Sequence, residues 1–216
     1  NFIEGAFGSA QDFFSQEISL AISSPGRYWQ SGLFYLADEL TQQNADAAEQ
    51  AILDLAAVFR AAMHAGDTID LAQELALTRQ YVSLEQWRLG ARLSVDWQLP
   101  TVIPELKLPS LTLQPLVENA IKYAVASQTC GGTISIKASK FGHDLLIEVA
   151  DNGPGMPIDD GLPKDSGGVG LVNTRERLAA LYDKDFSLVL THNQPQGVKV
   201  YIRIPFEVEL NDEELA

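Results

Sequence analysis

The chain has 216 residues, of which 46% are hydrophobic, and this length makes one large domain or two small ones. Its 29 acidic residues against 15 Lys and Arg give a net charge of −14, which argues against a nucleic-acid partner and against docking on an anionic membrane surface. The single cysteine, Cys130, excludes an internal disulfide, and no apolar run reaches the roughly 20 residues that span a bilayer. Because the chain begins at Asn1 rather than Met, we expect an excised soluble fragment, with any membrane anchor lying upstream.

Residues 10–90 are predicted to be helical. Apolar side chains recur there at three- and four-residue steps, and the repeats are interrupted at residues 23–26 and at Gly66. Amphipathic helices separated by short breaks predict a helical hairpin or bundle. The apolar stripe of these helices fits an internal core and equally fits pairing with a second chain.

Residues 91–210 alternate between strand and helix patterns. Strands are predicted at residues 93–97, 133–137, 145–149, 186–190 and 198–204, and helices at residues 111–125 and 170–182. Hairpins mixed with helices predict an α+β fold, with the helices on one face of a mixed sheet. We therefore expect a helical region at residues 1–90, an α/β domain at residues 91–208 and an acidic tail at residues 209–216.

The first cluster of candidate functional residues lies in the helix predicted at residues 111–125. Glu118, Asn119 and Lys122 are polar residues in an otherwise apolar segment. Glu118 and Lys122 are four residues apart and share a face, which fits a surface ion pair. Asn119 adds little to helix stability, but its side-chain oxygen can ligate a hard cation such as Mg²⁺. The cluster is either a solvated helix face or a metal site.

The second cluster, Asp-Asn-Gly-Pro-Gly-Met-Pro at residues 151–157, follows the apolar strand predicted at residues 145–149. Its composition fits a tight turn. A carboxylate held at a strand end, here that of Asp151, can also accept a hydrogen bond from an exocyclic amine. Gly153 and Gly155 would then let a flat ring approach the backbone. The segment is thus a turn or a binding site for a ring.

The third cluster, Gly-Gly-Val-Gly-Leu at residues 167–171, opens the helix predicted at residues 170–182. A glycine-rich loop that leads into a helix offers backbone N–H groups and the positive end of the helix dipole to a phosphate. Glycines can also simply cap a helix. Taken alone, Gly168 and Gly170 therefore do not decide between a phosphate site and a cap.

In order and context the three clusters resemble the N, G1 and G2 boxes of the GHKL ATP-binding fold, which is found in histidine kinases, Hsp90-type chaperones, gyrase B and MutL. The segments LQPLVENAIKYA, DNGPGMP and GGVGLVNTRERLAALY look like those of LytS-type sensor histidine kinases. A fourth block, YVSLEQWRLGARL at residues 81–93, resembles the YLxIExxRxGxRL linker of that family. The resemblance is strong over residues 70–206 and loose over residues 20–70. It implies dimerisation helices followed by an α/β-sandwich ATP-binding domain of the GHKL (Bergerat) type.

The resemblance also implies roles for the residues that match the family motifs. Asn119 would hold a Mg²⁺ ion that bridges the ATP phosphates, and its neighbour Glu118 would orient or deprotonate the attacking nucleophile. Asp151 would accept a hydrogen bond from the adenine amino group. Gly153 and Gly155 would let the adenine and its waters pack close to the backbone.

The implied lid over ATP is formed by residues 157–169. Gly168 and Gly170 would bend this lid and present N–H groups to the phosphates, and Lys122 would add a phosphate contact. Further contacts with the nucleotide are implied for Tyr123, Met156 and Leu171. The family often has His where Tyr123 stands, which is a mild departure in a position that lines the pocket. Arg175 and Arg177, in the helix after the lid, are expected in structural ion pairs.

The phosphoacceptor of a LytS-type kinase has no counterpart in this sequence. The family phosphorylates a His in a motif like NPHFLFN, and the matching stretch at residues 24–31 has Gly26 at the His position. Residues 1–63 contain no His. The three histidines of the chain, His64, His143 and His192, do not fall where the acceptor of the family stands. The ATP side of phosphoryl transfer is therefore predicted to be intact and the acceptor side to be absent.

Three functions fit these observations. The first is the cytoplasmic kinase portion of a LytS-type two-component sensor histidine kinase, which binds Mg-ATP but is not expected to phosphorylate itself in the usual place. It would be a degenerate sensor, or would phosphorylate a partner chain across a dimer. The second is a non-catalytic, nucleotide-sensing interaction module, or pseudokinase. The third is a GHKL ATPase of the chaperone or repair type, which the linker block at residues 81–93 and the short lid disfavour.

Partners and location follow from the same resemblance. We expect a homodimer through helices at residues 10–65, and a response regulator that reads the geometry of those helices. We expect no direct contact with nucleic acid. The chain is expected to be a cytoplasmic fragment of a protein anchored in the bacterial inner membrane through segments absent from this sequence.

Overall fold

The computed structural model describes residues 50, 53–54, 57, 68–126, 128–159, 162–163 and 169–206. The predicted dimerisation helices and acidic tail, with Gly26 and His64, lie outside the described residues except at the four positions before residue 68. The elements follow one another as β1 (Thr68–Asp70), α4 (Leu71–Leu89), η1 (Gly90–Arg92), β2 (Leu93–Gln98), β3 (Lys107–Pro109), α5 (Gln114–Ala120), η2 (Ile121–Ala126), β4 (Gly132–Phe141), β5 (Asp144–Asp151), β6 (Ile158–Asp159), β7 (Leu162–Pro163), α6 (Val169–Tyr182), β8 (Ser187–His192) and β9 (Val198–Pro205).

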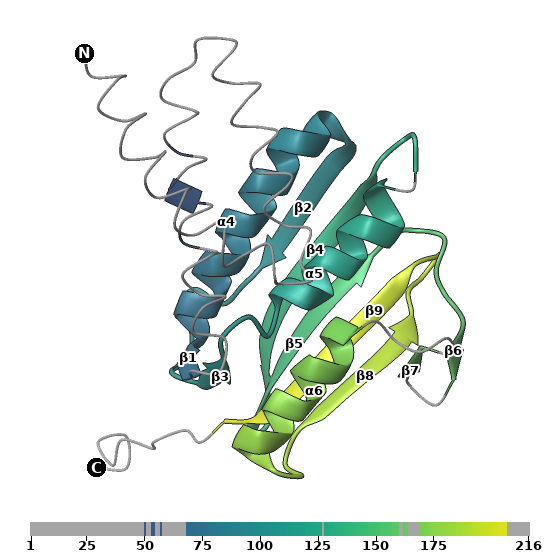
Figure 1. The fold of residues 1–216 in the computed structure, drawn as a ribbon. Helices are drawn as coiled ribbons and strands as arrows, with labels where there is room; N and C mark the ends of the chain where they lie inside the picture. Colours follow the sequence, from purple (N-terminus) through teal and green to yellow (C-terminus); the bar gives the residue numbers. More distant parts are fainter. Residues whose placement is uncertain are drawn as a thin grey trace, which may run out of the picture.

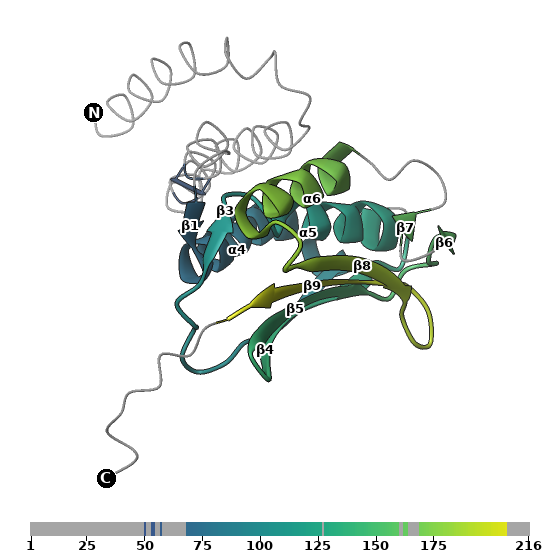
Figure 2. The same ribbon diagram turned by 90° about the horizontal axis from the view of Figure 1, so that it is seen from below.

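The centre of the described structure is a five-stranded mixed sheet in the order β2-β4-β5-β9-β8. β2 pairs with β4 in parallel, and every other neighbouring pair in this sheet is antiparallel. Figures 1 and 2 show α4, α5 and α6 lying over one face of this sheet. Two small two-stranded sheets, β1–β3 and β6–β7, accompany it. The predicted α+β fold, with helices on one face of a mixed sheet, is confirmed.

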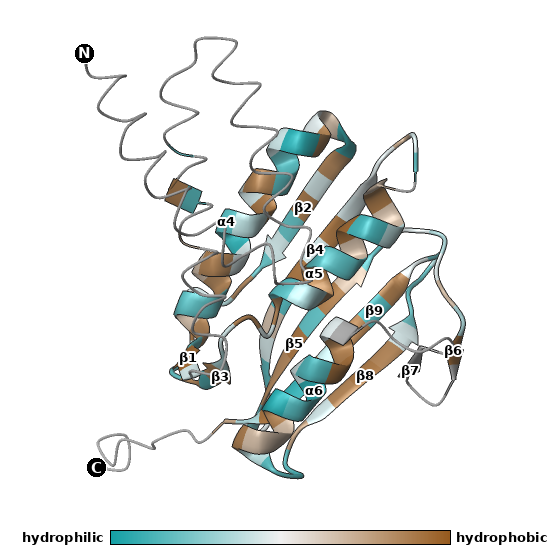
Figure 3. Cartoon of the chain, in the orientation of Figure 1, coloured by the Kyte–Doolittle hydropathy of each residue, from teal (hydrophilic) through white to brown (hydrophobic). Residues whose placement is uncertain are grey.

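The alternation of side chains along each strand places the core between sheet and helices. In β9, Val198, Val200, Ile202 and Ile204 are buried while the residues between them are partly exposed. Figure 3 shows the corresponding alternation of hydrophobic and hydrophilic bands along the strands and helices. One face of the sheet is therefore apolar, and the helices pack their apolar sides against it.

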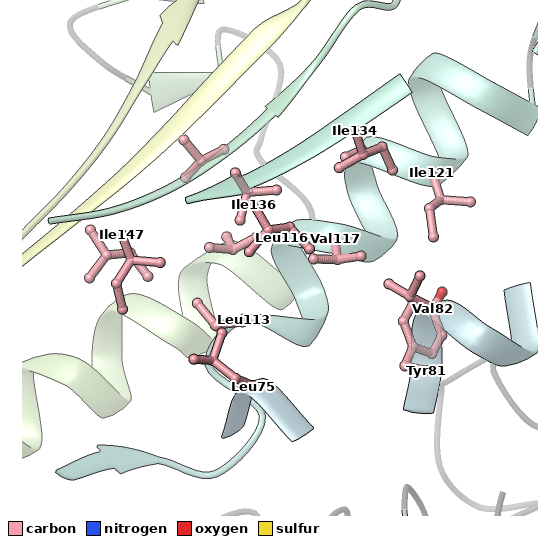
Figure 4. Close-up of a cluster of buried hydrophobic side chains, with 14 of the residues drawn as sticks. Leu75, Tyr81, Val82, Leu113, Leu116, Val117, Ile121, Ile134, Ile136 and Ile147 are labelled. Atoms are coloured by element: carbon pink, nitrogen blue, oxygen red, sulfur yellow. The ribbon is translucent and has the colours of Figure 1, made fainter. Parts of the chain in front are cut away.

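One hydrophobic cluster joins the helices to the sheet (Figure 4). Leu116 and Val117 of α5 lie with Ile134 and Ile136 of β4 in this cluster, and all four side chains are at most 1% exposed. Burying an aliphatic side chain of this size contributes roughly 1.5–3 kcal/mol, so the packing of α5 on β4 is a major source of stability. α4 shares the same cluster through its buried residues Leu71, Leu75, Tyr81, Val82, Leu84 and Leu89.

The elements differ from those predicted in several places, and the differences that bear on the candidate site are these. The helix expected at residues 111–125 begins only at Gln114 and ends as the π-helical segment η2, because Leu111 has a φ of 60° that no helix accommodates. The strand predicted at residues 145–149 continues as β5 through Asp151, so that Asp151 is its last residue. The short strands of β1–β3 and β6–β7 were not predicted. Within the described ranges, no helix combines the length and the apolar character needed to cross a membrane.

Candidate functional site

The first candidate cluster lies on α5 and η2, which run on without a break and are here called the α5–η2 helix. Pro115 stands in its first turn, where a missing N–H costs nothing. One side of the helix is buried against the sheet, and Glu118 and Asn119 lie half-buried at the edge of that side. The polar cluster thus borders the core and can be reached from solvent.

Lys122 and Tyr123 are exposed on the π-helical part of the α5–η2 helix. The Lys122 ammonium donates a hydrogen bond to the Tyr123 hydroxyl over 3.3 Å and lies 4.8 Å from the centre of its ring. The cation of Lys122 therefore lies beside the ring of Tyr123 on the exposed side of the helix.

The second cluster begins with Asp151, whose side chain is 7% exposed at the end of β5. Its Oδ1 accepts hydrogen bonds from the backbone N–H groups of Gly153, at 2.9 Å, and Val198, at 3.3 Å. Burial raises the pKa of this carboxyl, and the two N–H groups act in the opposite direction. Among the described residues, no hydrogen bond reaches Oδ2, so this oxygen remains available as an acceptor.

Glycine is required at two positions around Asp151 because a Cβ atom would not fit. A Cβ on Gly153 would lie 2.6 Å from Cα of Ala124, so the backbone after β5 packs directly on η2. A Cβ on Gly197 would lie 2.0 Å from the carbonyl oxygen of Asp151. Gly155 and Met156, the other predicted residues of this cluster, are half-buried, and Met156 packs against the core.

The turn between β8 and β9 holds the Asp151 segment from its other side. Asn193 Nδ2 donates to the Asp151 carbonyl oxygen at 2.7 Å, and Gln196 Nε2 donates to the Asn152 carbonyl oxygen at 3.1 Å. Asn152 Oδ1 in turn accepts from the N–H of Thr133 in β4 at 2.8 Å. The position of the carboxylate is therefore fixed by two strands and a turn.

The third cluster is described only in part, because Gly168 lies outside the described residues. Gly170, in the first turn of α6, is half-buried, and a Cβ there would lie 3.2 Å from Cβ of Pro115. Leu171 is 9% exposed and belongs to the core cluster. The start of α6 thus lies beside the start of the α5–η2 helix.

Arg175 and Arg177 of α6 bind backbone carbonyl groups. An Nη atom of Arg175 donates to the carbonyl oxygen of Leu188 at 2.6 Å. Those of Arg177 donate to the carbonyl oxygens of Ser110, at 2.6 Å, and Leu111, at 2.9 Å. Arg177 also interacts electrostatically with the buried Glu74 carboxyl, in line with the predicted ion pair, whereas the partner of Arg175 is a backbone carbonyl group.

The α5–η2 helix is the element that brings the three clusters together. Ala124 near its end contacts Gly153 of the second cluster, and Pro115 near its start contacts Gly170 of the third. No group of three or more His, Cys, Asp or Glu that could hold a metal occurs among the described residues. A cation at Asn119 would therefore have to share its ligands with a bound anion and water, which is the usual situation of Mg²⁺.

Sequence reasoning did not single out the residues that support this arrangement. Asn193 and Gln196 lie in a segment whose composition indicates only a turn. Glu74 of α4 is fully buried and reaches the start of the α5–η2 helix. The sequence did contain a sign that Glu74 is buried, because this residue lies on the apolar stripe formed by Leu71 and Leu75.

Two family models match the chain. The model described as "Histidine kinase-, DNA gyrase B-, and HSP90-like ATPase" matches residues 107–208, and the model described as "Histidine kinase" matches residues 34–93. The first match contains all the candidate site residues, from Glu118 to Leu171.

Curated relatives and solved structures lead to the same family. The sensor histidine kinase YesM of Bacillus subtilis is 33% identical over 146 residues, which cover 67% of this chain and 25% of the relative. The sensor protein LytS of Staphylococcus saprophyticus is 33% identical over 177 residues, which cover 77% of this chain and 30% of the relative. The histidine kinase domain of a blue-light activated histidine kinase from Erythrobacter litoralis has the same fold, with a TM-score of 0.52 and 18% identity over 92% of this chain and 94% of that domain.

The chain thus spans about a quarter to a third of the length of the curated relatives. Its helices and mixed sheet have the fold of a histidine kinase domain, and the second family model and the curated relatives are those of histidine kinases and their sensor proteins. The chain belongs to the GHKL-type histidine kinases, among the sensor kinases of the LytS type.

Proposed function

We propose that this chain binds ATP with Mg²⁺ between the α5–η2 helix, the end of β5 and the start of α6, as the kinase portion of a two-component sensor. The observation that carries the proposal is Asp151, a buried carboxylate with one oxygen fixed by two N–H groups and the other available. A single acceptor in a tight, glycine-lined site suits the exocyclic amine of adenine. The ATPase family match supports the same ligand.

The surrounding residues fit the rest of the nucleotide. Gly153 packs so closely on Ala124 that the backbone, rather than a side chain, forms the wall beside Asp151. Asn119 would provide an amide oxygen to Mg²⁺, which neutralises phosphate charge when bound, and Lys122 would contact a phosphate directly. Gly170 would contribute a backbone N–H at the start of α6, with Gly168, Met156, Leu171, Gly155 and Tyr123 as further contacts.

For phosphoryl transfer, a nucleophile would attack the γ-phosphorus while the bond to the leaving ADP oxygen breaks. Glu118 would orient the nucleophile or take its proton. In the family motif that this sequence resembles, the nucleophile is a His, and this chain has Gly26 at that position. This observation favours a second candidate function, a nucleotide-sensing module that does not phosphorylate itself.

Partners and location complete the proposal. The chain would form a homodimer through residues 10–65 and act on a response regulator, since its relatives are sensor proteins. We divide it at residue 90 into a dimerisation region and a catalytic domain that extends to residue 208. It would work in the cytoplasm, attached to the membrane only through further segments of the full-length protein.

Calorimetric titration with a non-hydrolysable ATP analogue and Mg²⁺ tests the proposal. We expect the 216-residue chain to bind the analogue and Asp151→Asn to weaken binding at least tenfold, because the amide replaces one oxygen of the carboxylate by a donor. Asp144→Asn, at the opposite end of β5 in an ion pair with Arg203, is the matched control and should bind like the wild type. Absence of heat, or equal binding by both variants, would contradict the proposal.

A further inference from the structure

A carboxylate of α4 holds the start of the α5–η2 helix. Glu74 is 0% exposed, and its two oxygens accept hydrogen bonds from the backbone N–H groups of Leu111, at 2.9 Å, and Leu113, at 2.6 Å. Leu113 stands at the N-cap position of α5 and has no side-chain acceptor of its own. Glu74 therefore supplies from another helix an acceptor for the N-cap N–H, the group that the N3 side chain of a capping box would otherwise bind.

The loop that Glu74 binds is strained. Leu111 has a φ of 60°, a conformation that costs a bulky L-residue free energy and persists only where its surroundings enforce it. Arg177 of α6 fixes the same loop through the carbonyl oxygens of Ser110 and Leu111. The N–H and the carbonyl of Leu111 are thus each held by a charged side chain, one from α4 and one from α6.

A guanidinium group just after α4 holds the other end of the same helix. Arg92, in η1, donates from an Nη atom to the carbonyl oxygens of Val125, at 3.2 Å, and Gln128, at 2.7 Å. A helix leaves its first N–H groups and its last carbonyl groups unpaired. Here an anion meets the first and a cation meets the last, and both belong to the continuous segment formed by α4 and η1.

The two contacts act on one half of the proposed site. The α5–η2 helix carries Asn119 and Lys122, which would bind Mg²⁺ and phosphate. Asp151, which would bind adenine, is held instead by Gly153, Val198 and the β8–β9 turn. Loss of the α4 contacts should therefore disturb the phosphate half of the site more than the adenine half, which the α5–η2 helix touches through Ala124 and Gly153.

We infer that Glu74 and Arg92 are positioning residues that fix the α5–η2 helix on α4 and so set the affinity for the Mg²⁺-phosphate part of the nucleotide. The inference rests on the proposed function, because it assigns the phosphate half of that site. Because Glu74 and Arg92 join α4 to the α5–η2 helix, a displacement of α4 would also move Asn119. In this way α4 would connect the site to the part of the chain before residue 71.

Measuring the binding of two ligands distinguishes a positioning role of Glu74 from a general loss of stability. The full chain and its Glu74→Gln variant are titrated with the Mg²⁺-bound ATP analogue by calorimetry, and with adenosine by NMR shifts at millimolar concentration. At pH 8, where the Glu74 carboxyl is largely ionised, Gln keeps the shape of Glu but turns one acceptor into a donor that faces an N–H group. We expect the dissociation constant of the analogue to rise about tenfold and that of adenosine to change less than about twofold.

Glu85→Gln is the matched control, because Glu85 is 3% exposed on the same helix but pairs with Arg88 of its own helix. It should bind both ligands like the wild type. Arg92→Ala, a change at an exposed residue, should again weaken the analogue more than adenosine even if Glu74→Gln fails to fold.

Each result is decisive for one of the two proposals. If the wild-type chain binds the analogue but Glu74→Gln and Arg92→Ala lose neither ligand, or lose both equally, the positioning role is refuted while the proposed function stands. If the wild-type chain does not bind the analogue at all, the proposed function is refuted and the inference with it.

Discussion

At the scale of single residues, two of the buried carboxylates, Asp151 and Glu74, differ in how the fold uses their oxygens. Asp151 keeps one oxygen without a hydrogen bond from the described residues, whereas both oxygens of Glu74 accept backbone N–H groups. A buried acceptor that the fold leaves available is a candidate for ligand binding, whereas one whose oxygens are both used by the backbone supports the fold. The hydrogen bonds therefore separate the roles of two residues that sequence composition treats alike.

Glu74 predicts a pH dependence of stability. Burial raises its pKa from 4.5 to about 7, against the opposing effects of the Leu113 and Leu111 N–H groups and Arg177. The native state then holds a proton that the unfolded state has lost between about pH 4.5 and pH 7, so the contribution of Glu74 to the unfolding free energy falls as pH rises through this window. At about 1.4 kcal/mol per pKa unit, the full change is on the order of 3 kcal/mol.

Urea unfolding of the wild type and Glu74→Gln at pH 5 and pH 8 measures this contribution. The wild-type advantage over the variant should be larger at pH 5 than at pH 8. Asp151, whose pKa burial also raises, is present in both proteins and cancels in the difference. An advantage that is the same at both pH values would show that Glu74 does not titrate in this window.

At the scale of elements, the turn between β8 and β9 is predicted to support adenine binding. Asn193→Ala removes the 2.7 Å hydrogen bond to the Asp151 carbonyl oxygen and leaves that strand end less well fixed. A lost hydrogen bond of this kind costs about 1 kcal/mol, so adenosine and the ATP analogue should both bind roughly fivefold more weakly.

Gln194→Ala, an exposed change in the same turn, is the control for this experiment and should leave both affinities unchanged. The pattern contrasts with Glu74→Gln, where the analogue should be affected more than adenosine. Selective loss of the analogue in Asn193→Ala would contradict the assignment of the turn to the adenine half.

The long elements could be predicted from the sequence because their periodicity is local. Alternating apolar residues located β4, β5 and β9, and three- and four-residue steps located α4 and α6. The strands of β1 and β7 are too short to show a period. The start of α5 was predicted at Leu111, three residues early, because the contacts that hold Leu111 out of the helix come from Glu74 and Arg177, far away in sequence.

The residues of the candidate site also fall into those that local sequence could identify and those that it could not. Asp151 and Asn119 could be identified because local motifs contain them, and their use in ATP binding stays a prediction. Asn193, Gly197 and Glu74 could not, because their importance depends on which distant backbone group each one meets. Local sequence thus indicates the groups that would touch a ligand and misses the groups that hold them.

At the scale of the whole molecule, the net charge of −14 bears on how a triphosphate could bind. An anionic protein repels an anionic ligand, so favourable local charge has to compensate at the site. At the proposed site, the exposed Lys122 and the helix start at Gly170 would provide part of this positive charge, and a Mg²⁺ ion would provide more. Affinity for the ATP analogue should therefore depend strongly on Mg²⁺.

The last prediction concerns phosphoryl transfer by the whole chain. With Gly26 at the position of the acceptor and no His in residues 1–63, the chain should bind ATP without phosphorylating itself. A phosphoryl group moves only to a nucleophile held in line with the γ-phosphate, and an intact nucleotide site does not replace that nucleophile. The predicted outcome is thus a site that binds its nucleotide and has no acceptor within the chain.

Incubation with γ-labelled ATP, followed by gel analysis before and after acid treatment, tests this outcome, since phosphohistidine is labile to acid. We expect no acid-labile label on the protein, while titration of the same preparation with the ATP analogue shows that the nucleotide site is functional. Histidine variants serve as the control for an unexpected signal. Label that is lost in acid and absent from His64→Ala would make His64 the acceptor and overturn the prediction, because the chain would then phosphorylate itself at a position outside the family motif.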